Sequence, residues 1–85
     1  MGFSSYQISV GEMPLYDDPI LGLIGEVGEV AEHVKNLRKP INLDEFELEL
    51  GDVLWYLTRL ADSYGLDMVM IAKRNIEKLN KRHNK

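Results

Sequence analysis

Residues 42–65 read NLDEFELELGDVLWYLTRLADSYG, and this stretch decides the fold class. Apolar side chains recur within it at alternating spacings of three and four residues: Leu43, Phe46, Leu50, Val53, Leu57, Leu60 and Tyr64. That spacing is a heptad seam, which is typical of a helix that packs against other helices. Asn42 followed three residues later by Glu45 has the form of a capping box, and Gly65 suits the end of a helix. We therefore predict a long helix over residues 43–64.

The segment before this stretch predicts a second long helix. Asp18 can cap a helix, and Pro19 suits its first position because the missing N–H would be unpaired there anyway. Pro40 cannot continue a helix, so we expect this one over residues 19–37. Its apolar stripe is again spaced by threes and fours, which indicates a helix: Ile20, Leu23, Ile24, Val27, Ala31 and Val34.

The two ends of the chain differ in character. Glycine and proline interrupt residues 1–17, so we expect at most a short helix over residues 3–8, followed by a loop. Asp67 suits the cap of a last helix over residues 67–82. The apolar stripe of that helix is Val69, Ala72, Ile76 and Leu79. No stretch alternates as a strand would, so the predicted fold class is all-α.

Residues 1–85 are expected to form a single domain that is too small to enclose its own helices. A chain of this length buries roughly 60–65% of the surface that its unfolded form exposes. The middle helix also carries Leu48 and Trp55 outside its seam, and a helix that is apolar on several sides needs cover on several sides. We therefore expect a small antiparallel helical bundle completed by oligomerisation, as a homodimer or a dimer of dimers.

Composition excludes several classes of function. The 85 residues contain no cysteine, which rules out a disulfide scaffold and a thiolate metal site. No uncharged apolar run approaches the ~20 residues of a membrane span. No Lys or Arg precedes Lys35, so the basic start of a signal peptide is missing. The net charge of −4 disfavours binding to a DNA or RNA duplex. We therefore expect a cytoplasmic protein without a membrane partner.

Four carboxylates occupy matching positions on the two long helices. Glu26 and Glu29 lie one turn apart on the first, and Glu49 and Asp52 repeat that arrangement on the second. Both pairs border apolar residues, where an acid is costly unless something compensates its charge. A divalent cation between the helices would do so, and oxygen ligands are what Mg²⁺ and Mn²⁺ prefer. The alternative is that these acids line a wet outer face.

Other chemistries fit the sequence less well. Carboxylate-bridged di-iron bundles use Glu-x-x-His on two helices, whereas His33 follows Glu29 by four residues and is best interpreted as a surface histidine. The glycines at 22, 25 and 28 lack the Lys-Ser/Thr and the preceding strand of a phosphate loop. Inside a helix, they predict the close approach of another helix.

Three segments resemble the MazG-like branch of the all-α nucleoside triphosphate pyrophosphohydrolases: GLIGEVGEVAEHVK (22–35), ELGDVLWYLTRLADSYGLD (49–67) and NIEKLNKR (75–82). The resemblance covers about residues 20–82, and FSSYQ (3–7) is similar to the opening helix of the family. The family pattern of Glu-x-x-Glu, a spacer and Glu-x-x-Asp is matched here by Glu26, Glu29, Glu49 and Asp52.

The resemblance implies Mg²⁺-dependent hydrolysis of a (deoxy)nucleoside triphosphate to the monophosphate and pyrophosphate, with Mn²⁺ as a substitute ion. By similarity the four acids hold the metal, and Glu26 is our choice for the residue that activates water. Lys78 and Arg82 are expected to contact the triphosphate, and Tyr56 and Asn75 to line the nucleotide site. The motifs leave open the base, the sugar and the number of ions.

A second function, from another class, fits the same helices. A non-catalytic helical oligomer that binds nucleotide or a protein partner would show a similar apolar pattern. The carboxylates discriminate between the two functions, because a degenerate binder is expected to lose one of the four, and all four are present.

Overall fold

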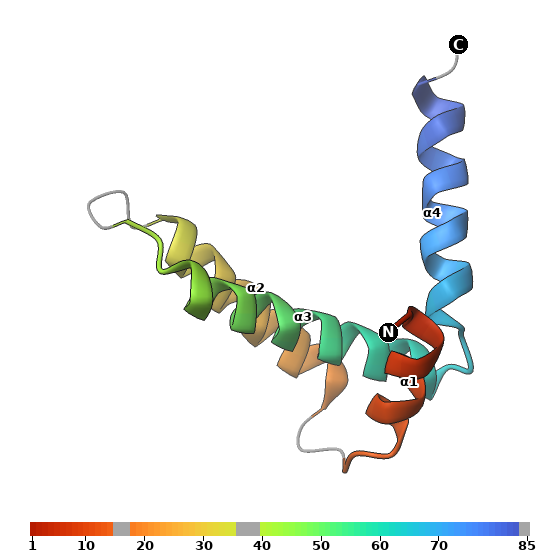
Figure 1. Cartoon of the computed structure of the whole chain (residues 1–85), viewed down its shortest axis with the longest axis horizontal. Coiled ribbons are helices and arrows are strands. Elements are labelled where there is room, and N and C mark those ends of the chain that lie inside the picture. Colours follow the sequence, from red (N-terminus) through yellow and green to blue (C-terminus); the bar gives the residue numbers. More distant parts are fainter. Residues whose placement is uncertain (15–17, 36–39, 84–85) are drawn as a thin grey trace.

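The computed structural model describes residues 1–14, 18–35 and 40–83, and within these ranges it contains helices and no strand. The four helices are α1 (Phe3–Gly11), α2 (Pro19–Lys35), α3 (Leu43–Ser63) and α4 (Met68–His83). α2 and α3 lie side by side and antiparallel, α1 crosses the far end of α3, and α4 extends away from the pair (Figure 1). The all-α prediction is confirmed.

The predicted helix starts are made by the expected caps. The side chain of Asp18 accepts hydrogen bonds from the backbone N–H groups of Ile20 (2.9 Å) and Leu21 (3.2 Å). Asn42 accepts one from the N–H of Glu45 at 3.1 Å, and Asp67 accepts one from the N–H of Val69 at 2.8 Å. Each cap satisfies backbone donors that a helix N-terminus leaves unpaired.

The helix ends agree less closely with the sequence. α3 closes where expected, because Gly65 adopts a φ of 69° and the N–H of Leu66 returns to the carbonyl of Ala61 at 2.9 Å, as in a Schellman motif. The predicted last residues of the helix over 19–37 lie outside the described residues. The N-terminal helix is longer than the segment expected over residues 3–8, since α1 continues to Gly11.

A distant arginine binds the C-terminal end of α1. The guanidinium of Arg59, on α3, donates to the backbone carbonyls of Val10 and Met13, each at 2.9 Å. Val10 lies in the last turn of α1, where its carbonyl also accepts a hydrogen bond from the backbone N–H of Met13 at 3.1 Å, and Met13 follows the helix. The contact joins residues almost 50 positions apart, so local sequence signals could not predict it.

The buried core lies where α1, α3 and α4 meet, and not between the two long helices. Among the described residues, the most deeply buried are Val10 of α1, Thr58 and Ala61 of α3 and Met68 of α4. The hydroxyl of Thr58 donates to the carbonyl of Leu54 at 2.7 Å, which satisfies its one buried polar group.

The α2–α3 interface corrects the predicted packing. The apolar stripe of α2, which was expected to face the core, lies mostly on the surface. In this stripe Leu23 is half-buried, and the other residues are exposed: Ile20, Ile24, Val27, Ala31 and Val34. The half-buried face of α2, which includes Glu26 and Val30, lies roughly 110° around the helix by the geometry of an α-helix. α2 and α3 therefore meet through the side that carries carboxylates.

This packing gives the chain an extended shape with a large exposed surface. Its radius of gyration is 15.1 Å, against roughly 12 Å for a compact domain of 85 residues. Its accessible surface is 6878 Å², which exceeds by roughly 1,700 Å² the value expected for a compact monomer of this mass. Within the described part of the chain, no helix combines the length and the apolar character that crossing a membrane requires.

Candidate metal centre

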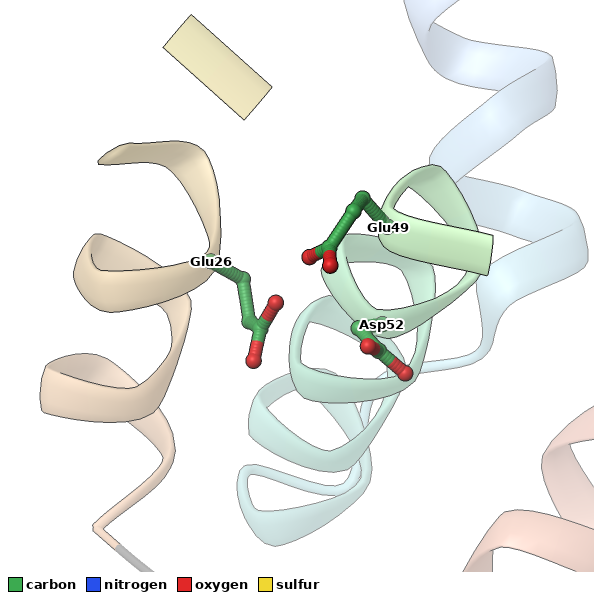
Figure 2. A group of neighbouring side chains, drawn as sticks. All are labelled: Glu26, Glu49 and Asp52. Atoms are coloured by element: carbon green, nitrogen blue, oxygen red, sulfur yellow. The ribbon is translucent and has the colours of Figure 1, made fainter. Parts of the chain in front are cut away.

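Three carboxylates from the two long helices converge on one point. Glu26 of α2 points across to α3, where Glu49 and Asp52 lie one turn apart (Figure 2). One oxygen atom from each of the three lies within 4.8 Å of the others. Such a set of oxygens offers the hard donors that Mg²⁺ and Mn²⁺ prefer.

Two oxygen atoms of this cluster are buried without a partner. Within the described residues, Oε2 of Glu26 and Oε2 of Glu49 are shielded from water and accept no hydrogen bond. Leaving buried polar atoms unpaired is costly, and more so when they carry charge. A cation would compensate both atoms at once, so the residues present fit a divalent metal ion.

The electrostatics of the cluster also indicate crowded negative charge. Partial burial raises the pKa of Glu26, and the charges of Glu29 and Asp52 raise it further, against a hydrogen bond with Glu49 that lowers it. A hydrogen bond to Glu49 is the main cause that raises the pKa of Glu29, and repulsion by Glu49 adds to it. In the absence of a cation, Glu26 and Glu29 therefore retain their protons more readily than separate glutamates do.

The fourth predicted ligand, Glu29, stands at the edge of the cluster. It lies one turn beyond Glu26 on α2 and interacts electrostatically with Glu49 and Asp52, but it is exposed and is not among the three converging carboxylates. His33 lies one turn further along α2 and lowers the pKa of Glu29. Its ring packs edge-on against the ring of Phe46, with 6.4 Å between the ring centroids.

Tyr56 lies beside the acids, as its position one turn after Asp52 suggests. It lines a hollow of about 310 Å³ together with Glu26, Glu29 and Gly22 of α2. A β-carbon at Gly22 would overlap the ring of Tyr56, whereas β-carbons at Gly25 and Gly28 would meet nothing within 4 Å. Of the three glycines expected to admit another helix, Gly22 alone does so among the described residues.

Sequence reasoning missed Tyr6 of α1. Burial raises the pKa of its phenol, and the negative charge of Asp52 raises it further. The two residues are 46 positions apart, and they are neighbours only because α1 crosses α3. No spacing in the sequence signals this proximity.

The remaining predicted site residues do not join the acids in this chain. Asn75 and Lys78 line a hollow formed by residues of α4 alone, and Arg82 is exposed in the last turn of that helix. Among the described helices, α4 packs substantially only against α1. The predicted substrate-binding residues of α4 therefore lie on a different part of the molecule from the predicted metal ligands.

The fold and the site together define an all-α protein with a carboxylate cluster between two antiparallel helices. Residues 17–85 match the MazG nucleotide pyrophosphohydrolase domain, and the chain belongs to this family. The Gene 37 protein of Mycobacterium phage L5 is 35% identical over 72 residues, which cover 76% of this chain and 63% of that protein. The chain thus spans less than two thirds of the length of this relative. No solved structure matches the chain.

Proposed function

We propose that the protein is a nucleoside triphosphate pyrophosphohydrolase, a hydrolase acting on acid anhydrides, that requires Mg²⁺ and accepts Mn²⁺ as a substitute. Water attacks the α-phosphorus of a (deoxy)nucleoside triphosphate, the bond to the β-phosphate oxygen breaks, and the nucleoside monophosphate and pyrophosphate leave. The observation that carries the proposal is the carboxylate cluster with its two unpaired buried oxygens, in a domain of the MazG family.

Each carboxylate has a role in this proposal. Glu26, Glu29, Glu49 and Asp52 hold the metal ion, which when bound neutralises phosphate charge and makes the α-phosphorus more electrophilic. Glu26 also orients the attacking water and accepts its proton. The position of Glu26 supports this choice, because it reaches across from α2 to the other acids and lines the hollow that Tyr56 also lines.

The other predicted residues bind the substrate. Tyr56, in the hollow beside Glu26, contacts the nucleotide. Asn75 also lines the nucleotide site, and Lys78 and Arg82 contact the phosphates, where their cationic side chains stabilise the negative charge of departing pyrophosphate. The working form is a homodimer or a dimer of dimers, which the exposed apolar residues on α2 and α3 support.

A turnover screen tests the proposal. The purified protein is incubated with Mg²⁺ and a panel of ribo-, deoxy- and modified nucleoside triphosphates, and monophosphate and pyrophosphate are detected separately. We expect both products in equal amounts from at least one substrate. Glu49→Gln should abolish them, while Glu47→Gln, the same change at an exposed position of α3, should not.

The screen also separates the two functions that the sequence leaves open. Release of inorganic phosphate in place of pyrophosphate would contradict the attack at the α-phosphorus. If the folded protein binds nucleotide or a protein partner but yields no product with any substrate, the non-catalytic helical oligomer replaces the enzyme.

A further inference from the structure

Two consecutive aromatic residues of α3 are in contact with each other. The rings of Trp55 and Tyr56 meet edge to face, with 5.1 Å between their centroids and an angle of 86° between their planes. Consecutive residues of a helix point about 100° apart, so their side chains do not normally face each other. The contact therefore requires that other parts of the molecule hold both side chains in place.

Trp55 is held by the C-terminal end of α1. Its indole N–H donates to Sδ of Met13, just beyond α1, at 3.2 Å. The guanidinium of Arg59 lies 6.0 Å from the centroid of the Trp55 ring, at the outer limit of a cation–π contact. Arg59 in turn donates to the carbonyls of Val10 and Met13. Met13, Trp55 and Arg59 thus form an anchor cluster that joins α3 to the end of α1.

Tyr56 connects the anchor cluster to the candidate metal centre. Its ring occupies the space that a side chain at Gly22 would fill. It also lines the hollow that Glu26 and Glu29 line. Contacts therefore run from the end of α1, through Trp55, to a side chain at the carboxylates.

Holding Tyr56 in advance affects binding more than chemistry. A side chain that is already fixed in its binding orientation loses less conformational entropy when a ligand contacts it. Loosening Tyr56 therefore weakens the binding of a ligand in the hollow, but it removes none of the carboxylates. The kinetic signature of such a change is a higher KM with kcat nearly unchanged.

We propose that Trp55 is a positioning residue of this site: anchored by Met13 and Arg59, it holds the ring of Tyr56 in the orientation that binds the ligand. That this ligand is a nucleotide rests on the proposed function, whereas the dependence of Tyr56 on the anchor cluster does not. The sequence marks Trp55 only as an apolar residue outside the heptad seam, and its contacts give it a role within the chain.

Steady-state kinetics tests the proposal with a substrate that the turnover screen identifies. Trp55→Leu removes the aromatic edge and should raise KM by roughly 3- to 10-fold, with kcat within about twofold of wild type. Tyr64→Leu, a similar change at a 73% exposed position at the end of α3, is the matched control and should alter neither constant. A merely structural role of Trp55 reduces the folded fraction, which lowers kcat and leaves KM unchanged. That result overturns the proposal.

A double-mutant cycle tests whether Trp55 acts through Tyr56. Tyr56→Leu should itself raise KM. Adding Trp55→Leu to it should raise KM no further, because the side chain that Trp55 positions is already gone. If the two effects on KM multiply, Trp55 acts independently of Tyr56, and the proposal is overturned.

NMR tests the anchor cluster without relying on activity. The protein is labelled with tyrosine that carries ¹³C in its ring, and the signals of Tyr56 are assigned by their loss in Tyr56→Phe. Met13→Leu removes the acceptor of the Trp55 N–H at nearly constant side-chain volume and should shift these signals. Met70→Leu, at a similarly exposed position of α4 (47%, against 45% for Met13), is the matched control and should leave them in place. Unshifted Tyr56 signals in Met13→Leu overturn the proposal.

The two kinds of measurement separate this proposal from the proposed function. If the wild type hydrolyses no nucleotide, the proposed function fails, and the NMR result alone decides whether the anchor cluster positions Tyr56. The NMR result decides in the same way if Trp55→Leu does not fold. If the wild type is active and KM is unchanged in folded Trp55→Leu, the positioning role is overturned and the proposed function stands.

Discussion

The ring of Tyr56 lies directly over the backbone of Gly22, at the point where α3 and α2 approach each other. This contact stands one turn from Glu26 along α2 and one turn from Asp52 along α3, so it sets how far apart the carboxylates are held. The spacing of the metal centre thus depends on a position where any side chain would be too large.

Gly22→Ala should therefore destabilise the protein by about 1–3 kcal/mol, because the added methyl group overlaps the ring of Tyr56 and forces the helices apart. Urea unfolding measures the loss. Gly28→Ala is the matched control: its β-carbon meets nothing within 4 Å, so higher helix propensity should raise stability by up to ~1 kcal/mol. Equal losses from both variants would contradict the close approach at Gly22.

Asp52→Asn should separate metal binding from folding. Removing one negative charge relieves repulsion within the cluster, so the variant should unfold at a higher temperature than wild type in chelator. It should also lose the rise in unfolding temperature that Mg²⁺ gives the wild type, and turnover should fall by at least ~100-fold. Asp44→Asn, in the exposed first turn of α3, should retain both Mg²⁺ stabilisation and turnover. Undiminished stabilisation by Mg²⁺ in Asp52→Asn would exclude Asp52 as a ligand.

The stability of the metal-free protein should depend on pH through Glu26 and Glu29. Burial for the first and a hydrogen bond with Glu49 for the second are the largest causes that raise their pKa values above the ordinary 4.5. The folded state therefore binds more protons than the unfolded state in the range above pH 4.5, and their contribution to stability is lost as pH rises through the raised pKa values.

Thermal unfolding in chelator should accordingly show stability from these groups increasing as the pH falls from neutral towards 4.5. Glu29→Gln should weaken the dependence of the unfolding temperature on pH. Saturating Mg²⁺ should weaken it too, because the cation replaces the protons bound by Glu26 and Glu29. A wild-type curve identical to that of Glu29→Gln would show that the acids do not interact.

Gln7→Ala should release α4. The substitution leaves the backbone groups of Leu66 and Met68 without their side-chain partner, at a cost of about 1–3 kcal/mol. We expect faster proteolysis between residues 63 and 68, measured by mass spectrometry of the fragments. Ser4→Ala, at an exposed position of the same helix, should cleave like wild type. Unchanged cleavage in Gln7→Ala would show that the core around Met68 fixes α4 without help from Gln7.

The local signals for helices proved sufficient for the starts of α2, α3 and α4. Asp18, Asn42 and Asp67 cap the helices that they were expected to start, and Gly65 ends α3. Caps act within three or four residues, so the sequence carries all the information that they need. The sequence also indicated which acids share a helix face, whereas the convergence of Glu26, Glu49 and Asp52 required the carboxylate side of α2 to meet α3.

The packing between elements was decided by the tertiary structure. Periodicity marks the apolar stripe of α2, but it does not say whether that stripe meets α3 or another molecule, and in this chain it is the carboxylate side that meets α3. The placement of Tyr6 beside Asp52, and the clamp of Gln7 at the root of α4, depend on contacts between residues at least 46 positions apart. The sequence by itself determined which helices form and which acids they carry, because those are local properties. Only the fold decided that α4, with its basic residues, extends away from the helices that carry those acids, because the direction of a helix after a turn depends on distant contacts.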